Sequence, residues 1–235
     1  MKWSVLVLVL LSSIGALAED LASAKSAYGE KDRDLNAVWS SLKAVVAESE
    51  MATLTKEQKD WLEYRDHKAE SLMRFNGDTV PEDIKTSAMY WEYCALLTGD
   101  RTSILRAILS YQKGEELEWS GEWNDGYDGS LWIGAIRGRE APFLISCVRG
   151  PTAHVGELAG TAVINGNIAR VTIREEGMEE ETWLTFIMRG GKLEVIGQNT
   201  QYFHGARAYF DGEYYRVGEL TAKQSAEIHK VISLP

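Results

Sequence analysis

The stretch GTAVINGNIARVTI, from Gly160 to Ile173, carries the pattern that decides the fold of the second half of this chain. Two short runs rich in β-branched residues flank the pair Asn165–Gly166, and such a pair between such runs is typical of a tight β-hairpin. The stretch RGGK, from Arg189 to Lys192, separates two further runs in the same way. Both stretches therefore predict antiparallel strands joined by short turns.

The same pattern extends over residues 117–220. Short runs rich in β-branched or aromatic residues are SLWIGAI, PFLISCV, GTAVING, IARVTI, TWLTFIM, KLEVIG, ARAYF and YYRVGEL. The pair Asp211–Gly212 between the last two runs predicts another hairpin, with about half of its aromatic side chains facing the core. Seven or eight strands at this spacing predict a small antiparallel β-barrel or sandwich. The tail, residues 221–235, is expected to add one or two helical turns.

Residues 19–112 show a helical period instead. Leu21, Tyr28, Leu35 and Leu42 recur every seven residues, which places them on one stripe of a long first helix.

Two further helices are predicted after it. Thr55, with Gln58 three residues later, has the pattern of a capping box and predicts the start of a second helix that ends near Phe75. Pro81 suits the first turn of a third helix. Three amphipathic helices with short connections predict an antiparallel bundle, and the whole chain is therefore expected to be α+β.

The first 18 residues have the pattern of a signal peptide. Lys2 precedes the apolar run WSVLVLVLL, and Ala16-Leu17-Ala18 forms an A-x-A cleavage site. Cleavage after Ala18 would leave Glu19 at the N-terminus, where no cysteine is available for a lipid anchor. We therefore expect a periplasmic or secreted protein with no stable membrane anchor after cleavage.

The charge balance narrows the class of partner. The formal net charge is −10 at pH 7, and losing Lys2 with the signal peptide would make it −11. Nucleic acid is an unsuitable partner, because neutralising phosphates requires a basic surface. An acidic exported domain is better matched to a basic envelope protein, although plain solubility also explains the charge.

Sequence motifs for catalysis or metal binding are absent. His67, His154, His204 and His229 lie in separate regions and do not have zinc-ligand spacing. The stretch NDGYDG, residues 124–129, is interpreted as a turn because it lacks the alternating ligands of a calcium loop. The acidic run REEGMEEE, residues 174–181, is interpreted as a solvated loop. We therefore expect no metal, no cofactor and no enzymatic activity.

The two cysteines, Cys94 and Cys147, have apolar neighbours on either side. Buried free thiols fit this setting. A disulfide between them is the alternative in an oxidising compartment, and it would join the two predicted domains.

Polar residues stand beside the apolar stripes of the helical half. They are Asn36, Gln58, Arg65, Asp66 and Arg101. Because polar groups at a helix interface must pair, Arg65 and Arg101 are expected to take Asp66, Asp34 or Asp100 as partners. This set predicts a structural clamp that holds the helices in register, with a binding site as the alternative.

The helical half resembles a known family through three motifs in the same order. They are D-L-N-x-x-W at residues 34–39, Q-x-x-W-L-x-Y-R-D at 58–66 and C-A-x-L-T-x-x-R-T-x-x-L at 94–105. These motifs are similar to those of the LprI-type helical domain of exported bacterial proteins. The family usually has a cysteine soon after Y-R-D. This chain has Ala69 there, so the resemblance implies that the intradomain bridge is missing.

The second half resembles a β-rich domain that often follows such helices, through AHVGELAG at residues 153–160 and ARAYFDGEYYRV at 206–217. The family resemblance implies an envelope protein with lysozyme inhibition as its activity. Two loops would then supply cations or donors for an enzyme's cleft, with candidate contacts Arg149, His154, His204 and Arg207. The alternatives are an envelope interaction or structural module without inhibitory activity, and a hydrolase with its cleft at the domain boundary.

Overall fold

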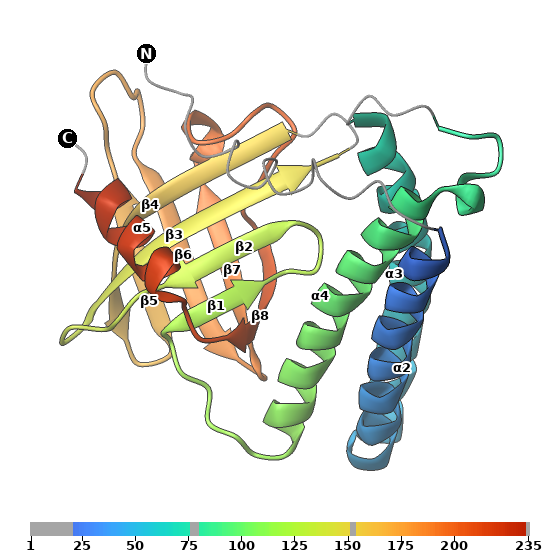
Figure 1. Cartoon of the computed structure of the whole chain (residues 1–235). Coiled ribbons are helices and arrows are strands. Elements are labelled where there is room, and N and C mark those ends of the chain that lie inside the picture. The colour runs from blue at the N-terminus through green and yellow to red at the C-terminus, as the bar shows by residue number, and fades with distance from the viewer. Residues whose placement is uncertain (1–20, 76–79, 151–153, 234–235) are drawn as a thin grey trace.

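The computed structural model describes residues 21–75, 80–150 and 154–233, so the predicted signal peptide lies outside the described residues. Three long helices come first, and a closed antiparallel barrel of eight strands follows (Figure 1). The predicted α+β class is confirmed, and of the two predicted β-architectures the barrel is the one formed. The change from helix to strand falls between Gln112 and Gly121.

The helical part is built from α2 (Leu21–Val45), α3 (Glu48–Phe75) and α4 (Ala88–Gln112), with a short 3-10 turn η1 (Ile84–Thr86) before α4. Helix α4 packs against both α2 and α3. The helices share one apolar core, whose buried members are Leu35, Val38, Leu42, Leu54, Trp61, Ala69, Met73, Tyr90, Tyr93, Cys94, Leu97 and Leu105. Among the described residues, no helix combines the length and the apolar character that a membrane span requires.

Two predicted helix starts are wrong. Helix α3 begins at Glu48, so Thr55 lies inside it, and its hydroxyl donates to the carbonyl oxygen of Met51 at 2.7 Å instead of capping. Pro81 precedes η1 and is not in the first turn of α4, whose N-cap is Ser87. A threonine within a helix can satisfy its hydroxyl on the preceding turn, so the Thr-x-x-Gln pattern alone does not mark a start.

The barrel is a simple meander in which each strand pairs with the next, and β8 pairs with β1 to close it. Its strands are β1 (Gly121–Asn124), β2 (Gly129–Ile133), β3 (Glu140–Arg149), β4 (His154–Asn165), β5 (Ile168–Ile173), β6 (Thr182–Arg189), β7 (Lys192–Gln198) and β8 (Gly212–Gly218). The hairpins predicted at INGN and RGGK are confirmed, with Asn165 opposite Ile168 and Arg189 opposite Lys192.

The predicted hairpin at Asp211–Gly212 is wrong, because ARAYF is a loop and not a strand. Ala208 and Phe210 are buried while Tyr209 between them is exposed, so the segment alternates like a strand although it pairs with no neighbour. The Asp211 carboxylate accepts a hydrogen bond from the backbone N–H of Gly197 at 2.9 Å. The barrel reaches eight strands through β1 instead, whose short sequence GEWN has no pattern that predicts a strand.

Side chains fill the interior of the barrel. Alternate residues of each strand point inward, as in the row of Phe143, Ile145 and Cys147 along β3. Phe143 and Phe186 meet edge to face with their ring centroids 5.1 Å apart. An eight-stranded barrel is about wide enough for its own side chains. Ligand sites should therefore be sought on its loops or its outer wall.

The C-terminal tail forms a longer helix than predicted, α5 (Ala222–Ile232), of about three turns. A capping box begins this helix: the Thr221 side chain accepts a hydrogen bond from the N–H of Gln224, and the Gln224 side chain accepts one from the N–H of Thr221. Helix α5 contacts β2, β3 and β4, and it lies across their outer faces in Figure 1. The outward-facing Leu144 and the α5 residue Ile228 are both buried.

The bundle meets the barrel along one side. Helix α4 contacts β8, and α3 contacts the turn between β1 and β2. In that turn Lys68 forms an ion pair with Asp128, and the rings of Tyr64 and Tyr127 lie edge to face at 4.9 Å. Gly126 has φ +81°, and a Cβ there would lie 3.0 Å from the Ile104 side chain. The turn therefore fits closely against the helices.

Both cysteines are free and buried, and the alternative of a disulfide between Cys94 and Cys147 is wrong. Cys94 belongs to the core of the helical bundle and Cys147 to the core of the barrel. A disulfide requires the two Cα atoms to lie within about 7 Å, and these thiols belong to separate cores.

Glu157 links the pH to the stability of the α5 contact. It points outward from β4, and burial raises the pKa of its carboxyl group, with a further contribution from Glu227 on α5. Its folded pKa thus lies above the unfolded value of about 4.3, so the ionised form destabilises the folded state as the pH rises past that value.

We predict that Glu157→Gln raises the melting temperature by about 2 °C at pH 7.5 and changes it little at pH 4. Thermal unfolding followed by circular dichroism at both pH values measures this difference. Glu63→Gln, at an exposed position on α3, is the matched control and should change neither value. An equal gain from Glu157→Gln at both pH values would contradict the electrostatic explanation.

Candidate functional site

The meander gathers four connections at one end of the barrel, which we call the loop end: β1–β2, β3–β4, β5–β6 and β7–β8. All four contact residues predicted from the sequence lie there. Arg149 and His154 flank the β3–β4 connection and face each other in the strand register, while His204 and Arg207 lie between β7 and β8. The structure therefore brings the four residues to one end, although their roles differ.

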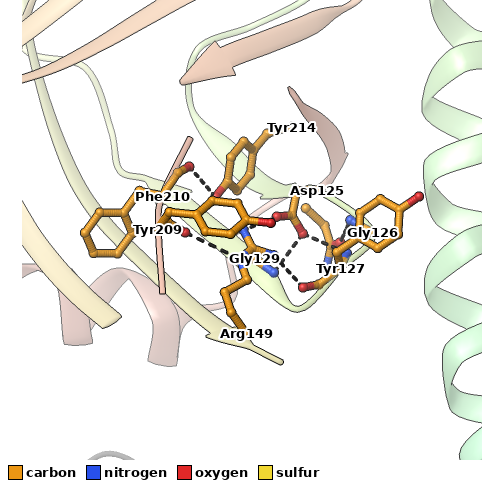
Figure 2. A network of polar contacts seen from close by, with 9 residues as sticks. Asp125, Gly126, Tyr127, Gly129, Arg149, Tyr209, Phe210 and Tyr214 are labelled. Carbon is orange, nitrogen blue, oxygen red and sulfur yellow. Dashed lines mark hydrogen bonds and ion pairs between the residues drawn. The ribbon is translucent and has the colours of Figure 1, made fainter. Parts of the chain in front are cut away.

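Arg149 is not an exposed contact residue, and that expectation is corrected: its side chain is only 6% exposed. Figure 2 shows it inside a network of polar contacts. Its guanidinium donates to the Asp125 carboxylate at 2.5 Å, to the carbonyl oxygen of Tyr127 at 2.5 Å and to that of Tyr209 at 3.4 Å. Arg149 thus ties three chain segments together beneath the surface.

Asp125 completes this network and shows why NDGYDG is a turn. One of its oxygens binds Arg149, and the other accepts the backbone N–H groups of Tyr127 and Gly129 at 2.8 and 2.7 Å. The second aspartate of the turn, Asp128, pairs with Lys68. Both carboxylates are therefore engaged by protein donors. Within the described residues, no group of three or more His, Cys, Asp or Glu is arranged to hold a metal ion.

Two tyrosines form the exposed surface above the buried arginine. Tyr209 is 52% exposed, with its ring 4.7 Å from the Arg149 guanidinium carbon, and Tyr127 is 44% exposed. The loop that carries Tyr209 is fixed from inside, where the Tyr214 hydroxyl donates to the carbonyl oxygen of Phe210 at 3.0 Å. Burial raises the pKa of Tyr214, so its hydroxyl remains protonated and keeps its role as a donor.

Of the remaining predicted contacts, Arg207 is the exposed one. It lies in a turn closed by the N–H of Ala208 and the carbonyl oxygen of Gly205, and among the described residues it has no ion-pair partner. His204 is half-buried, and its two ring nitrogens lie 2.9 Å from the Thr200 hydroxyl and 2.9 Å from the Gly205 carbonyl oxygen. His204 therefore holds the loop, while Arg207 faces outward.

His154 lies beside the same loop. A Cβ on Gly205 would be 3.5 Å from its Nδ1, so the β3–β4 and β7–β8 connections touch at this point. The loop end thus presents Tyr127, Tyr209 and Arg207 on a scaffold held by buried groups. Sequence reasoning did not assign Asp125, Tyr127 or Tyr209 to this surface.

The acidic run between β5 and β6 borders the loop end without forming a catalytic pair. Its glutamates are largely exposed, and Met178 is the buried residue of the turn. Arg174 and Glu181 approach to 3.9 Å across the turn, and the N–H of Glu179 donates to the Tyr202 hydroxyl. The run is therefore a solvated turn, and it adds negative charge beside Tyr202.

In the helical half, two arginines stack on one tryptophan. Arg65 and Arg101 lie over the ring of Trp61, at 5.7 and 5.9 Å from its centroid. Arg65 binds Asp66 at 2.6 Å and the hydroxyl of Tyr28 on α2 at 2.9 Å.

Arg101 donates to the side chain of Gln58 on α3 at 2.8 Å. This hydrogen bond links α4 to α3, and the bond from Arg65 to Tyr28 links α3 to α2, so polar contacts join all three helices. Four of the five residues predicted for the clamp take part in these contacts.

Asn36, the fifth residue, does not join them. It is exposed and donates to Asp32 within α2. Of the predicted partners of the arginines, Asp66 does bind Arg65, whereas Asp34 pairs instead with Arg106 at 2.9 Å. Arg101 has Gln58 in place of a carboxylate, and burial lowers the pKa of its guanidinium.

A groove of about 220 Å³ lies where the bundle meets the barrel. Its walls are formed by Val46, Glu50, Thr53, Leu54, Glu57, Ile108, Tyr111 and Gln112 from the helices, and by Gly190, Gly191, Lys192 and Tyr215 from the barrel. Glu50 accepts a hydrogen bond from Gln112 at 3.2 Å. Burial and the nearby Glu213 and Glu57 raise the pKa of Tyr215 to about 12, so its hydroxyl stays protonated at neutral pH.

The comparison with known families concerns the helical half. Residues 12–105 match the family described as Lysozyme inhibitor LprI, and this range ends at Leu105 within α4. The three-helix part of the chain is therefore LprI-like, whereas the barrel lies outside the matched residues. No curated protein and no solved structure matches the chain.

We predict that Arg149→Ala lowers the free energy of unfolding by about 3–5 kcal/mol, because it leaves the buried Asp125 carboxylate without its cation. Denaturant unfolding measures this loss. The matched control is Arg189→Ala, which removes an ion pair of the same 2.5 Å length from an arginine that is 66% exposed, and it should cost at most about 1 kcal/mol. The double variant R149M/D125N should recover part of the loss, since it removes both charges. Equal costs for Arg149→Ala and its control would contradict the structural role.

Proposed function

We propose, from the premise that its helical half is LprI-like, that this chain is an exported binding protein that inhibits a lysozyme or a similar wall-cutting glycoside hydrolase. The observation that carries the proposal is the match of residues 12–105 to a family described as lysozyme inhibitors. Export is supported by the first 18 residues, which combine Lys2, an apolar run and an A-x-A site. The protein would act by occupying its partner and not by catalysis.

The loop end is the surface best suited to this role. Tyrosine, tryptophan and arginine supply most of the binding energy in protein interfaces, and this surface exposes Tyr127, Tyr209 and Arg207. The Arg149–Asp125 pair holds the loop backbone from beneath, so little conformational entropy would be lost on binding. Helix α3 contacts the same turn through Tyr64 and Lys68, which places the LprI-like part beside this surface.

Charge supports such a partner at two levels. Lysozymes are typically basic, so a protein with net charge −10 would be drawn toward them over long range. Their clefts are lined by catalytic carboxylates. Arg207, an exposed guanidinium without an ion-pair partner in the described chain, can pair with a carboxylate through two parallel hydrogen bonds.

We predict that the purified protein slows clearing of a bacterial cell-wall suspension by at least one type of lysozyme. Arg207→Ala and Tyr209→Ala should each weaken this inhibition about tenfold, as expected for residues at the centre of an interface. Arg137→Ala, an exposed arginine in the β2–β3 connection at the opposite end of the barrel, is the matched control and should inhibit like the wild type.

Other outcomes separate the alternatives. If excess protein has no effect on several types of lysozyme and captures a different envelope component, the chain is an envelope interaction module and not an inhibitor. Clearing of the suspension by the protein alone would favour a hydrolase. That alternative rests on the groove at the domain boundary, where Glu50 and Glu57 share one wall. In that case Glu57→Gln should abolish the clearing.

A further inference from the structure

One part of the outer wall of the barrel is not covered by a helix of the described chain. Helix α5 covers β2, β3 and β4, and α4 meets β8, which leaves the outer faces of β5, β6 and β7. Three of the large apolar side chains that this protein exposes lie on this wall or at its edge: Val163 at 51%, Trp183 at 42% and Ile196 at 44%. Trp183 and Ile196 are diagonal neighbours on β6 and β7, and this exposed apolar pair bordered by polar groups is a candidate binding surface.

The strand register shows how these side chains are arranged. Val163, Arg170, Thr185 and Ile196 face one another in a single row across β4, β5, β6 and β7. Trp183 lies two residues before Thr185 in β6, on the same face of the sheet and opposite Gln198. All of these residues except Val163 line a shallow hollow of about 180 Å³, to which Gly197 also contributes.

The chemistry of the hollow is that of a small saccharide site. Pockets for drug-sized ligands measure about 300–1,000 Å³, so this hollow suits a single ring lying on the surface. A pyranose ring has one face of C–H groups and a rim of hydroxyls. The exposed indole of Trp183 offers a flat apolar partner for that face, while Gln198 and Thr185 supply donors and acceptors for the rim.

Arg170 gives the hollow its charge preference. It is the one charged residue in the lining, and among the described residues its guanidinium has no ion-pair or hydrogen-bond partner. A positive hollow on a protein of net charge −10 is matched by an anionic ligand. The planar guanidinium pairs with a carboxylate through two hydrogen bonds. A second copy of this chain is a poorer occupant, because a two-fold contact across this wall would bring one Arg170 toward the other.

We propose that the Trp183–Arg170 wall binds a saccharide that carries a carboxylate, as an acidic sugar of a cell-wall or surface glycan does. The sugar ring lies against Trp183, and its carboxylate pairs with Arg170. This site is separate from the loop end, so it does not depend on the proposed inhibition. It adds a glycan ligand to a protein whose first proposed partner is another protein.

The test is a titration followed by NMR on the full mature chain, with the indole N–H signal of Trp183 assigned by its absence in Trp183→Ala. The probes are N-acetylmuramic acid and glucuronic acid, which carry a carboxylate, and N-acetylglucosamine, which does not. We expect the acidic sugars to shift the Trp183 signal and to bind about tenfold more tightly than the neutral one.

The variants make the proposal falsifiable. Arg170→Gln should remove the preference for acidic sugars while leaving the indole response, and Trp183→Ala should abolish binding of all three, as read from the backbone N–H signals of β6 and β7. Arg33→Gln, at an exposed arginine on α2 in the helical bundle, should bind like the wild type. Trp183→Ala should still inhibit lysozyme if the wild type does, which separates this proposal from the previous one.

Either of two results would overturn the proposal. The first is the absence of any shift of the Trp183 signal at millimolar sugar, or shifts of the backbone N–H signals of β6 and β7 that survive both variants. The second is a concentration-dependent dimer in sedimentation that Trp183→Ala dissociates, which would assign the wall to a second copy of the chain. Circular dichroism of each variant checks that it is folded.

Discussion

The buried ion pair between Arg149 and Asp125 holds together the part of this molecule that faces partners. It joins the β1–β2 turn, the end of β3 and the loop before β8, which are remote in sequence. A buried charge destabilises the folded state unless its hydrogen-bonding atoms have partners. Here both oxygens of Asp125 accept hydrogen bonds, and each of the three guanidinium nitrogens of Arg149 donates one. The pair therefore specifies one loop arrangement, and the exposed Tyr209 and Tyr127 take their positions from it.

The same turn connects the barrel to the helices. Asp125 orients the turn by binding its backbone N–H groups, and the turn then presents Tyr127 to Tyr64 and Asp128 to Lys68. Within the bundle, Arg65 and Arg101 stack on Trp61 and tie the three helices through Tyr28 and Gln58. Polar groups thus fix the register in the bundle and at its junction with the barrel, where apolar packing alone tolerates small shifts.

Sequence patterns predict the features of this fold that depend on neighbouring residues. The Asn-Gly and Gly-Gly turns gave correct hairpins because the turn conformation and the flanking β-branched runs are local properties. The ARAYF loop has the sequence pattern of a strand, because alternate residues are buried in it although no partner strand is present. The burial of Arg149 cannot be predicted from neighbouring residues, because its partner, Asp125, lies 24 positions away in a turn whose sequence gives no sign of an arginine contact.

The two proposed sites differ in how the chain builds them, and this difference suits different ligands. The loop end is prepared by buried charges and hydrogen bonds, as recognition of a folded partner requires, because ordering loops on binding would weaken the complex. The wall around Trp183 and Arg170 is built on strands whose register is already set by the closed barrel, so a small ring can bind with little rearrangement. A protein held on a wall glycan by one face would present its other face at high effective concentration to an enzyme that cuts the same wall. A weak saccharide site would then add to inhibition at the wall without being required for it.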